Sequence, residues 1–352
     1  MTLASDLLGR AETFRRFGET HEAVVTAEDV TPGTPLTDTG ESSARTQSQR
    51  FGDRLARQVA ERRSQLVLGL DPDPARLWPR AVESAPGDGE PPSSRAARAV
   101  ALHCTMAIEA AGEHCAAVKP QVACFERLGA PGWSALAETV RRAREHGLLV
   151  IADAKRGDID VTAAAYAQAY FGETPTPFGT VPSLGADAMT VNPLLGADSL
   201  GPLVSAARGA GGGLFVLTRT SNPGAADVQE LTLAGGGSVS ERIAVIVAEL
   251  GAPSVGDRVL ADIGAVVGAT APERLERLRE LMPHAPFLLP GVGAQGGHVE
   301  ELSPAFAPGP AGGLISASRG IVFAHERLGG DPARAARDEA ARLRELAWDL
   351  AR

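Results

Sequence analysis

The sequence predicts an α/β protein, a single (β/α)8 TIM barrel preceded by an N-terminal extension. Short apolar runs of the kind that form fully buried strands recur along the chain, and between them lie stretches with apolar residues at i, i+3 and i+4, as in 239–250. Buried strands that alternate with helices indicate a parallel sheet with a covered outer face, and eight such units favour a closed barrel over an open doubly wound sheet. The eight runs are 66–70, 116–118, 148–152, 188–191, 214–217, 263–267, 287–289 and 313–316.

The first 49 residues differ from the rest of the chain. The stretch 31–50 is rich in Thr, Ser, Gly and Pro and has no hydrophobic periodicity, which is typical of a linker or a disordered segment. The pattern changes at Phe51, where Phe51, Leu55 and Val59 recur at helical spacing. We therefore expect residues 1–49 to form a disordered extension and residues 50–352 to form the barrel.

Composition and charge narrow the class of protein. The chain has 352 residues and a formal net charge of −9, which argues against a general binder of nucleic acid or anionic membranes. No apolar run approaches the ~18 residues that span a bilayer, and the N-terminus lacks the pattern of a secretory signal. The three cysteines, Cys104, Cys115 and Cys124, have no C-x-x-C spacing and indicate neither a disulfide framework nor a zinc site. We expect a cytoplasmic protein.

Lysine is unusually scarce. Only two of the 34 basic residues are lysines, Lys119 and Lys155. Arginine is effectively never deprotonated, whereas an ammonium group is a compact charge that can give up a proton. Lys155 lies in the segment D-A-K-R-G-D directly after the third run, between Asp153 and Asp158. A solvated strand end with ordinary ion pairs is the alternative, but the scarcity of lysine favours a catalytic role for Lys155.

Polar residues follow the predicted strands, where barrels of this kind carry their active sites. Each could be a cap or turn residue, and for Asn192 alone that alternative is equally good. Together they predict one pocket at the carboxyl ends of the strands. The residues that follow the runs are, in order, Asp71, Lys119, Asp153, Lys155, Asn192, Thr218, Ser221, Asn222, the glycine-rich stretch 291–297 and the stretch 316–320.

The loops after the seventh and eighth strands indicate a phosphate site. Glycine-rich backbone in 291–297 lets N–H groups approach an anion, and Arg319 adds a planar donor that can bind two oxygens. A merely flexible glycine loop is the alternative. The long polar connection 218–238 is of a length typical of a loop that covers a substrate.

Six motifs occur in order along the chain: G-L-D-P, K-P, D-A-K-R-G-D-I, S-N-P-G, P-G-V-G-A-Q-G-G and S-R-G. Over about residues 51–350, this pattern resembles the orotidine 5′-phosphate decarboxylase family, in particular its longer-chain bacterial branch. The resemblance implies decarboxylation of a nucleotide, orotidine 5′-monophosphate, to uridine 5′-monophosphate in pyrimidine biosynthesis, with no metal, flavin or pyridoxal cofactor.

The resemblance also implies residue roles and a homodimer. Asp158 and Thr162 are expected to reach into the pocket of the other subunit, with Asp158 joining Asp71 on the ribose hydroxyls. The implied charge array is Lys119, Asp153, Lys155 and Asp158; the implied substrate contacts are Asp71, Thr162, Ser221, Gln295, Arg319 and Gly320.

Two other functions remain as alternatives. Mg²⁺-dependent sugar-phosphate decarboxylases and synthases of the same superfamily share the D-x-K-x-x-D pattern, but they use an additional acidic ligand after the second strand, where this chain has Lys119. A non-catalytic phosphosugar-binding protein is the second alternative.

Overall fold

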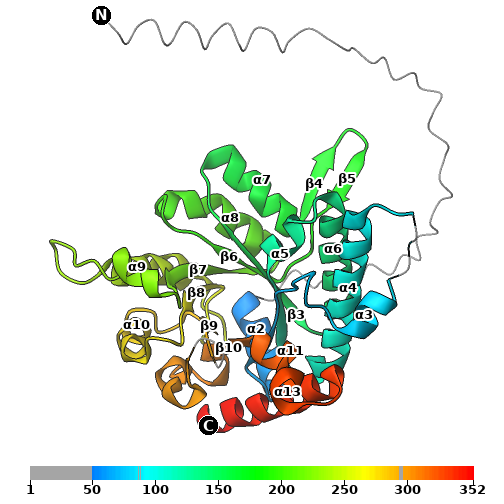
Figure 1. The fold of residues 1–352 in the computed structure, drawn as a ribbon. Helices are drawn as coiled ribbons and strands as arrows, with labels where there is room; N and C mark the ends of the chain where they lie inside the picture. Colours follow the sequence, from blue (N-terminus) through cyan, green and yellow to red (C-terminus); the bar gives the residue numbers. More distant parts are fainter. Residues whose placement is uncertain (1–49, 86, 88, 293–295) are drawn as a thin grey trace, which may run out of the picture. The chain divides into compact units, whose positions relative to one another are not determined.

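Eight parallel strands close a barrel in a computed structural model that describes residues 50–85, 87, 89–292 and 296–352 (Figure 1). The described residues belong to one compact unit, and the predicted extension 1–49 lies outside them. The predicted (β/α)8 barrel is confirmed, and each of the eight runs overlaps a different strand. The barrel strands are β1 (Leu66–Leu70), β2 (Ala117–Pro120), β3 (Leu149–Arg156), β6 (Ala188–Val191), β7 (Gly213–Arg219), β8 (Ile263–Val267), β9 (Phe287–Pro290) and β10 (Gly313–Ala317).

Helices cover the outer face of the barrel. Their starts follow local chemistry: Ser238 caps α9 in a reciprocal capping box with Glu241, and Asp331 caps α13 by accepting from the amide of Arg334. None of the helices in the described part of the chain is both long and apolar enough to cross a membrane. The helices are α2 (Phe51–Arg62), α3 (Pro79–Glu83), α4 (Pro92–Ala111), α5 (Val122–Glu126), α6 (Ala130–Glu145), α7 (Asp160–Tyr170), α8 (Ala197–Gly209), α9 (Val239–Gly251), α10 (Leu275–Leu281), α11 (Arg319–Val322), α12 (Ala324–Leu328) and α13 (Pro332–Leu350).

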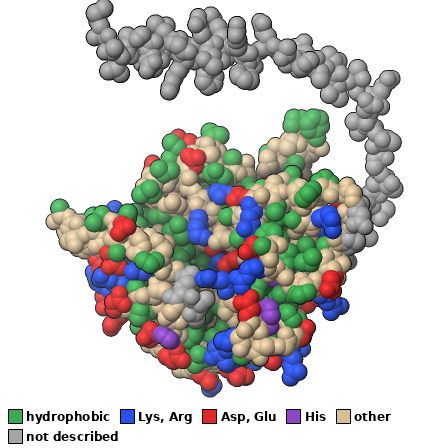
Figure 2. Space-filling view, in the orientation of Figure 1, with side chains coloured by type: hydrophobic (Ala, Val, Ile, Leu, Met, Phe, Trp, Pro, Cys, Tyr) green, Lys and Arg blue, Asp and Glu red, His purple; other side chains and the backbone are tan. Residues whose placement is uncertain are grey.

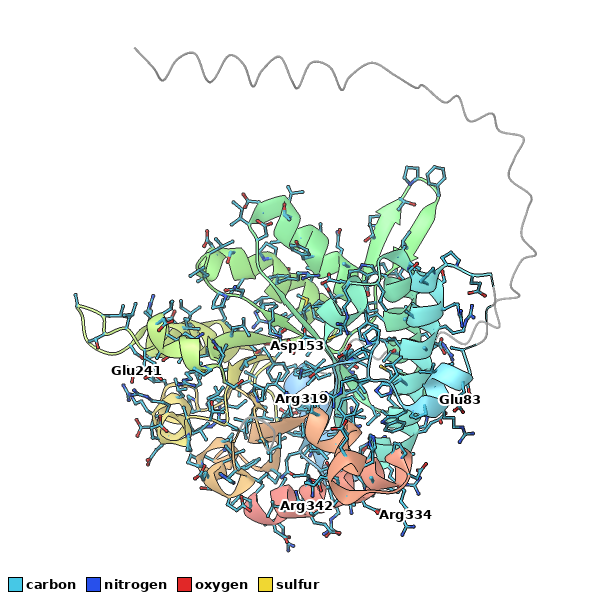
Figure 3. All side chains as sticks on the ribbon, in the orientation of Figure 1. Glu83, Asp153, Glu241, Arg319, Arg334 and Arg342 are labelled. Atoms are coloured by element: carbon cyan, nitrogen blue, oxygen red, sulfur yellow. The ribbon has the colours of Figure 1, made fainter. Side chains whose placement is uncertain are left out.

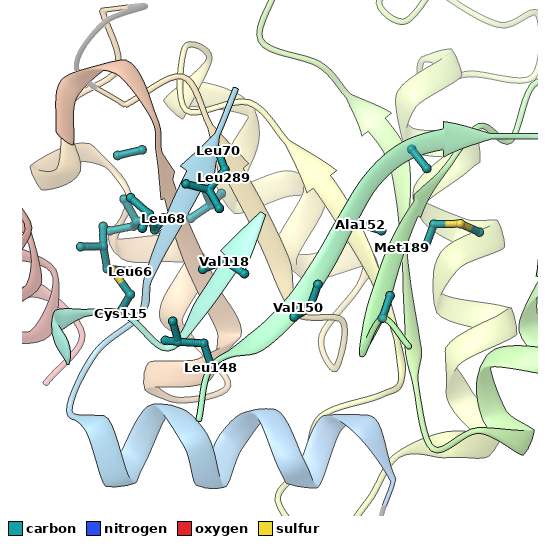
Figure 4. Close-up of a cluster of buried hydrophobic side chains, with 14 of the residues drawn as sticks. Leu66, Leu68, Leu70, Cys115, Val118, Leu148, Val150, Ala152, Met189 and Leu289 are labelled. Atoms are coloured by element: carbon teal, nitrogen blue, oxygen red, sulfur yellow. The ribbon is translucent and has the colours of Figure 1, made fainter. Parts of the chain in front are cut away.

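Two hydrophobic layers stabilise the barrel. The outer layer lies between strands and helices and includes Leu66, Leu68 and Leu70 of β1 (Figure 4). The inner layer takes a residue from every strand, such as Val67 and Phe215, because alternate side chains of a strand point to opposite faces. Helix α2 lies across the amino ends of the strands and adds Phe51 to this inner layer (Figure 4). The amino end of the barrel is thereby closed.

Strand β3 is longer than the sequence predicts. The apolar run ends at Ala152, but backbone pairing with β6 continues to Arg156, which pairs with Val191 across a register shift. A hydrophobic run in the sequence marks only the apolar part of a strand, so the charged end of β3 could not be predicted from it. Asp153 and Lys155 therefore belong to the strand itself.

A small antiparallel hairpin was not predicted. Strands β4 (Glu173–Thr176) and β5 (Gly179–Pro182) pair only with each other, outside the barrel, and project beside α7 (Figure 1). Prolines at the end of β5 and within β4 disrupt the alternating apolar pattern that would reveal strands. Phe178 at its turn is 99% exposed.

Candidate active site

A cavity of about 420 Å³ opens at the carboxyl ends of the strands. Charged side chains gather around a hollow in the middle of this face, and Asp153 and Arg319 both lie there (Figures 2 and 3). Of the ten residues expected to form the charge array or to contact the substrate, the structure brings seven together in this cavity, and Asn222 of the predicted pocket lines it too. The seven are Asp71, Lys119, Asp153, Lys155, Ser221, Arg319 and Gly320.

The two lysines of the chain both bind one carboxylate. The Nζ of Lys119 lies 2.7 Å from Oδ2 of Asp153, and the Nζ of Lys155 lies 2.5 Å from Oδ1. Lys119 and Asp153 are each 7% exposed, whereas the side chain of Lys155 is about half exposed and faces the cavity. One ammonium is thus part of the barrel wall, and the other is available to a bound molecule.

The charges of this cluster stabilise one another. Burial alone would raise the pKa of Asp153, but the ammonium groups of Lys119 and Lys155 outweigh it and hold that pKa far below its usual range. Burial alone would lower the pKa of Lys119, yet the negative charges of Asp153 and Asp71 raise it above its ordinary value. At neutral pH the cluster therefore holds ionised Asp153 beside protonated Lys119.

Two residues of the cluster were not predicted from the sequence. Gln121 follows β2 and donates to Oδ2 of Asp153 at 3.1 Å, and Thr190 in β6 donates to Oδ1 at 2.9 Å. A glutamine after the K-P motif was the available signal for the first. A threonine within a buried strand is an ordinary strand former, so Thr190 gave no signal.

Two glycines let the loops approach the barrel closely. A Cβ at Gly69 in β1 would lie 2.6 Å from the Cβ of Ser318, and a Cβ at Gly268 would lie 2.7 Å from the Cα of Ser221. Only glycine leaves this room. The absence of side chains at these positions brings Ser221 and the segment that carries Arg319 to the edge of the cavity.

Arg319 lines the same cavity from a different strand than the lysine cluster does. It follows β10, is exposed, and forms no ion pair with any carboxylate of the described residues. Gly291 and Val292 of the glycine-rich loop, which follows the neighbouring strand β9, line the cavity too. A free guanidinium beside glycine backbone is suited to an anion such as phosphate. Gln295, predicted to bind phosphate, lies outside the described residues.

Two predicted residues lie away from the cavity of their own chain. Asp158 is half-buried in the turn between β3 and α7, where its Oδ1 accepts from the amide of Ile159, and Thr162 is exposed on α7. Neither lines the cavity. Asn192 is a turn residue, because its Oδ1 accepts from the amide of Leu194.

Together, the fold and site define a (β/α)8 enzyme whose pocket holds two ammonium groups on one carboxylate and, from another strand, an exposed guanidinium. The sequence profile of the Orotidine 5′-phosphate decarboxylase / HUMPS family matches residues 64–338. The chain belongs to this family.

Individual relatives agree with this assignment. An orotidine 5′-phosphate decarboxylase of Deinococcus radiodurans is 44% identical over 302 residues, which cover 84% of this chain and 96% of the relative. One of Haloarcula marismortui is 44% identical over 78% of this chain and 88% of the relative. A solved structure of Leishmania donovani OMP decarboxylase is 32% identical, has a TM-score of 0.63, and covers 86% of this chain and 100% of that one.

Proposed function

We propose that this protein removes CO2 from orotidine 5′-monophosphate to give uridine 5′-monophosphate, as the names of its relatives describe for them. The observation that carries the proposal is the pair of ammonium groups on one buried carboxylate, inside a cavity that is also lined by Arg319, which forms no ion pair among the described residues. The reaction needs a proton donor next to the developing carbanion and a group that binds the phosphate, which is distant from the bond that breaks. Lys155 and Arg319 supply these two elements.

The chemical step follows from the position of Lys155. The bond between C6 of the pyrimidine and its carboxylate breaks, CO2 leaves, and the electron pair remains on C6. The ammonium of Lys155 stabilises this negative charge and transfers a proton to C6, after which the neutral amine regains a proton from water. Asp153 presents its negative charge beside the substrate carboxylate and favours its departure. Lys119 keeps Asp153 ionised.

The remaining cavity residues hold the nucleotide. Arg319, the amide of Gly320 and Gln295 bind the 5′-phosphate in this proposal, and Ser221 binds the pyrimidine. Asp71 binds the ribose hydroxyls. The phosphate is remote from the bond that breaks, so its binding energy is free to order the loops over the cavity and exclude water.

The Mg²⁺-dependent alternative needs a carboxylate where this chain has Lys119. The side chain of Lys119 is buried against Asp153 and occupies the place beside it with a positive charge. A cation there repels a divalent metal. The decarboxylase therefore accounts for the site better than the metal-dependent enzymes do.

The test is a reaction with chelator-treated protein. Added orotidine 5′-monophosphate should lose its absorbance, with uridine 5′-monophosphate and CO2 formed in equal amounts. Activity that appears only when Mg²⁺ is restored would favour the metal-dependent alternative. Binding of the nucleotide without turnover would favour a phosphosugar-binding protein.

We also propose that two subunits share each active site. Asp158 lies outside the cavity of its own chain, next to apolar side chains that face solvent in the single subunit, including Val161, 83% exposed, and Ile159. Exposed apolar groups beside a carboxylate fit a surface that a second copy covers. Asp158 and Thr162 would then enter the partner's cavity.

We further propose a cytoplasmic location, which suits the three unpaired thiols of the chain.

Mixing two inactive variants tests the shared site. Lys155→Ala and Asp158→Ala chains should each be nearly inactive alone. After subunit exchange, a heterodimer has one doubly damaged site and one intact site, so up to about half the activity per heterodimer should return. If mass spectrometry confirms exchange and no activity returns, Asp158 acts within its own subunit.

A further inference from the structure

Thr190 bridges the two residues that carry the proposed chemistry. It is 1% exposed in β6, and its Oγ1 lies 2.9 Å from Oδ1 of Asp153 and 3.0 Å from the backbone nitrogen of Lys155. A hydroxyl has one hydrogen to donate and lone pairs with which to accept. Because an ionised carboxylate only accepts and an amide N–H only donates, Thr190 donates to Asp153 and accepts from Lys155.

The backbone of Lys155 needs such support. Its φ is +50°, in the left-handed region that costs energy for any residue with a side chain. Regular pairing does not hold it there, because the register between β3 and β6 shifts between Ala152 and Arg156. Within this interval the Lys155 amide binds the Thr190 hydroxyl instead. Irregular strand positions of this kind aim a side chain in a direction that a regular strand does not allow.

We infer that Thr190 is a positioning residue for the decarboxylation proposed above, on which this inference rests. One hydroxyl fixes both the left-handed backbone of Lys155 and the carboxylate oxygen that binds its ammonium group. The ammonium and the carboxylate therefore face a common point in the cavity. Gln121 binds the other carboxylate oxygen and leaves the Lys155 backbone untouched, so its contribution is different.

A positioning role differs from a merely structural one in its kinetic signature. The residues proposed to bind the base and the phosphate, Ser221 and Arg319, follow β7 and β10 on other parts of the ring. Loss of the Thr190 hydroxyl should leave those contacts unchanged and displace the proton donor. The expected result is a lower kcat with an unchanged KM.

Three variants separate the possibilities. Thr190→Val keeps the shape and removes both hydrogen bonds, whereas Thr190→Ser keeps the hydroxyl. Thr139→Val is the matched control, because Thr139 is also fully buried but donates to the carbonyl of Ala135 within α6, outside the cavity. We expect kcat to fall about 10²-fold in Thr190→Val, the scale of a small misplacement of reacting groups. KM and the affinity for uridine 5′-monophosphate should stay within about threefold, and Thr190→Ser and Thr139→Val should retain most activity.

A second measurement does not depend on turnover. The Lys155 amide should exchange hydrogen for deuterium faster in Thr190→Val than in wild type or Thr139→Val, because it has lost its acceptor. Thr190→Ala replaces Thr190→Val in both measurements if the valine variant does not fold. A kcat close to wild type, an equal loss in Thr190→Ser, or unchanged exchange at Lys155 would overturn the inference. A wild-type protein that releases no CO2 would contradict the proposed function instead, and the exchange at Lys155 would still decide whether Thr190 holds it.

Discussion

The two ends of the barrel use the same strands for opposite purposes. At the amino end the interior is largely apolar: Phe51 of α2 packs edge-on against Phe215 at 6.1 Å between ring centres, and both are buried. At the carboxyl end the same ring of strands carries Lys119 and Asp153, whose charges are buried at the expense of their hydration. The amino end is built to stabilise the fold, and the carboxyl end is built to act on a ligand.

Because the two ends differ in this way, substitutions at the amino end should change mainly stability, and substitutions at the carboxyl end should change mainly activity. Buried charges that satisfy one another contribute little net stability, so losing a partly exposed member of the cluster should affect mainly chemistry. Removing apolar volume at the closed end should affect mainly unfolding. Four substitutions test this division.

Lys155→Arg should have the largest effect, and on activity alone. The guanidinium keeps the positive charge but is a poor proton donor, so kcat should fall by at least the ~10²–10⁴-fold typical of a lost general acid. The side chain is about half exposed, so the melting temperature should change little. Steady-state rates and thermal unfolding of the same samples measure both. Activity within about threefold of wild type would refute the role of Lys155.

Phe51→Ala should have the converse effect. Phe51 is 1% exposed, and its loss should lower the free energy of unfolding by about 3–5 kcal/mol through lost burial and the cavity left behind. Phe178→Ala is the matched control, because the same atoms are removed from a side chain that is 99% exposed. Denaturant titrations give both values, and kcat of the folded Phe51→Ala protein should match wild type. A large loss of kcat in the folded protein would mean that the two ends are coupled.

Arg319→Ala should act on binding and leave the chemistry of the lysine cluster intact. A hydrogen bond to a charged group contributes about 1.5–3 kcal/mol, so affinity for uridine 5′-monophosphate should fall roughly 10- to 150-fold. Uridine, which lacks the phosphate, should bind equally to both proteins. Calorimetric titration with the two ligands checks this, and an equal loss for both would show that Arg319 does not act through phosphate.

The sequence predicts this division only in part. Eight apolar runs were enough to find eight strands, because full burial leaves a continuous hydrophobic signal. The charged ends of those strands identified Lys119, Asp153 and Lys155, and lysine scarcity singled out the two ammonium groups. Thr190 could not be found in this way, because its role depends on a register shift between two strands distant in sequence.

At the amino end of the barrel, too, the sequence predicted the elements but not how they pack together. The spacing of Phe51, Leu55 and Val59 predicted a helix with one apolar face. It did not predict that this helix covers the amino end of the barrel, because an apolar helix face can be buried against any apolar surface. The hairpin of β4 and β5 was missed because prolines mask its alternation. Local sequence patterns therefore predict which faces of an element are buried. The elements that pack against those faces are known only from the three-dimensional structure.

Gln65→Met should have the smallest effect and the opposite sign. Gln65 precedes β1 and is fully buried, and neither its Oε1 nor its Nε2 has a hydrogen-bond partner among the described residues. Alternation along the strand gives it the same orientation as Val67, toward the apolar inner layer. An unpaired buried amide costs about 1–3 kcal/mol, and methionine fills nearly the same volume without polar atoms. We therefore expect the free energy of unfolding to rise by about 1 kcal/mol, with kcat unchanged, in denaturant titrations of the two proteins. A less stable Gln65→Met protein would mean that the amide has a partner after all, such as an enclosed water, and that this polar group contributes to the stability of the amino end.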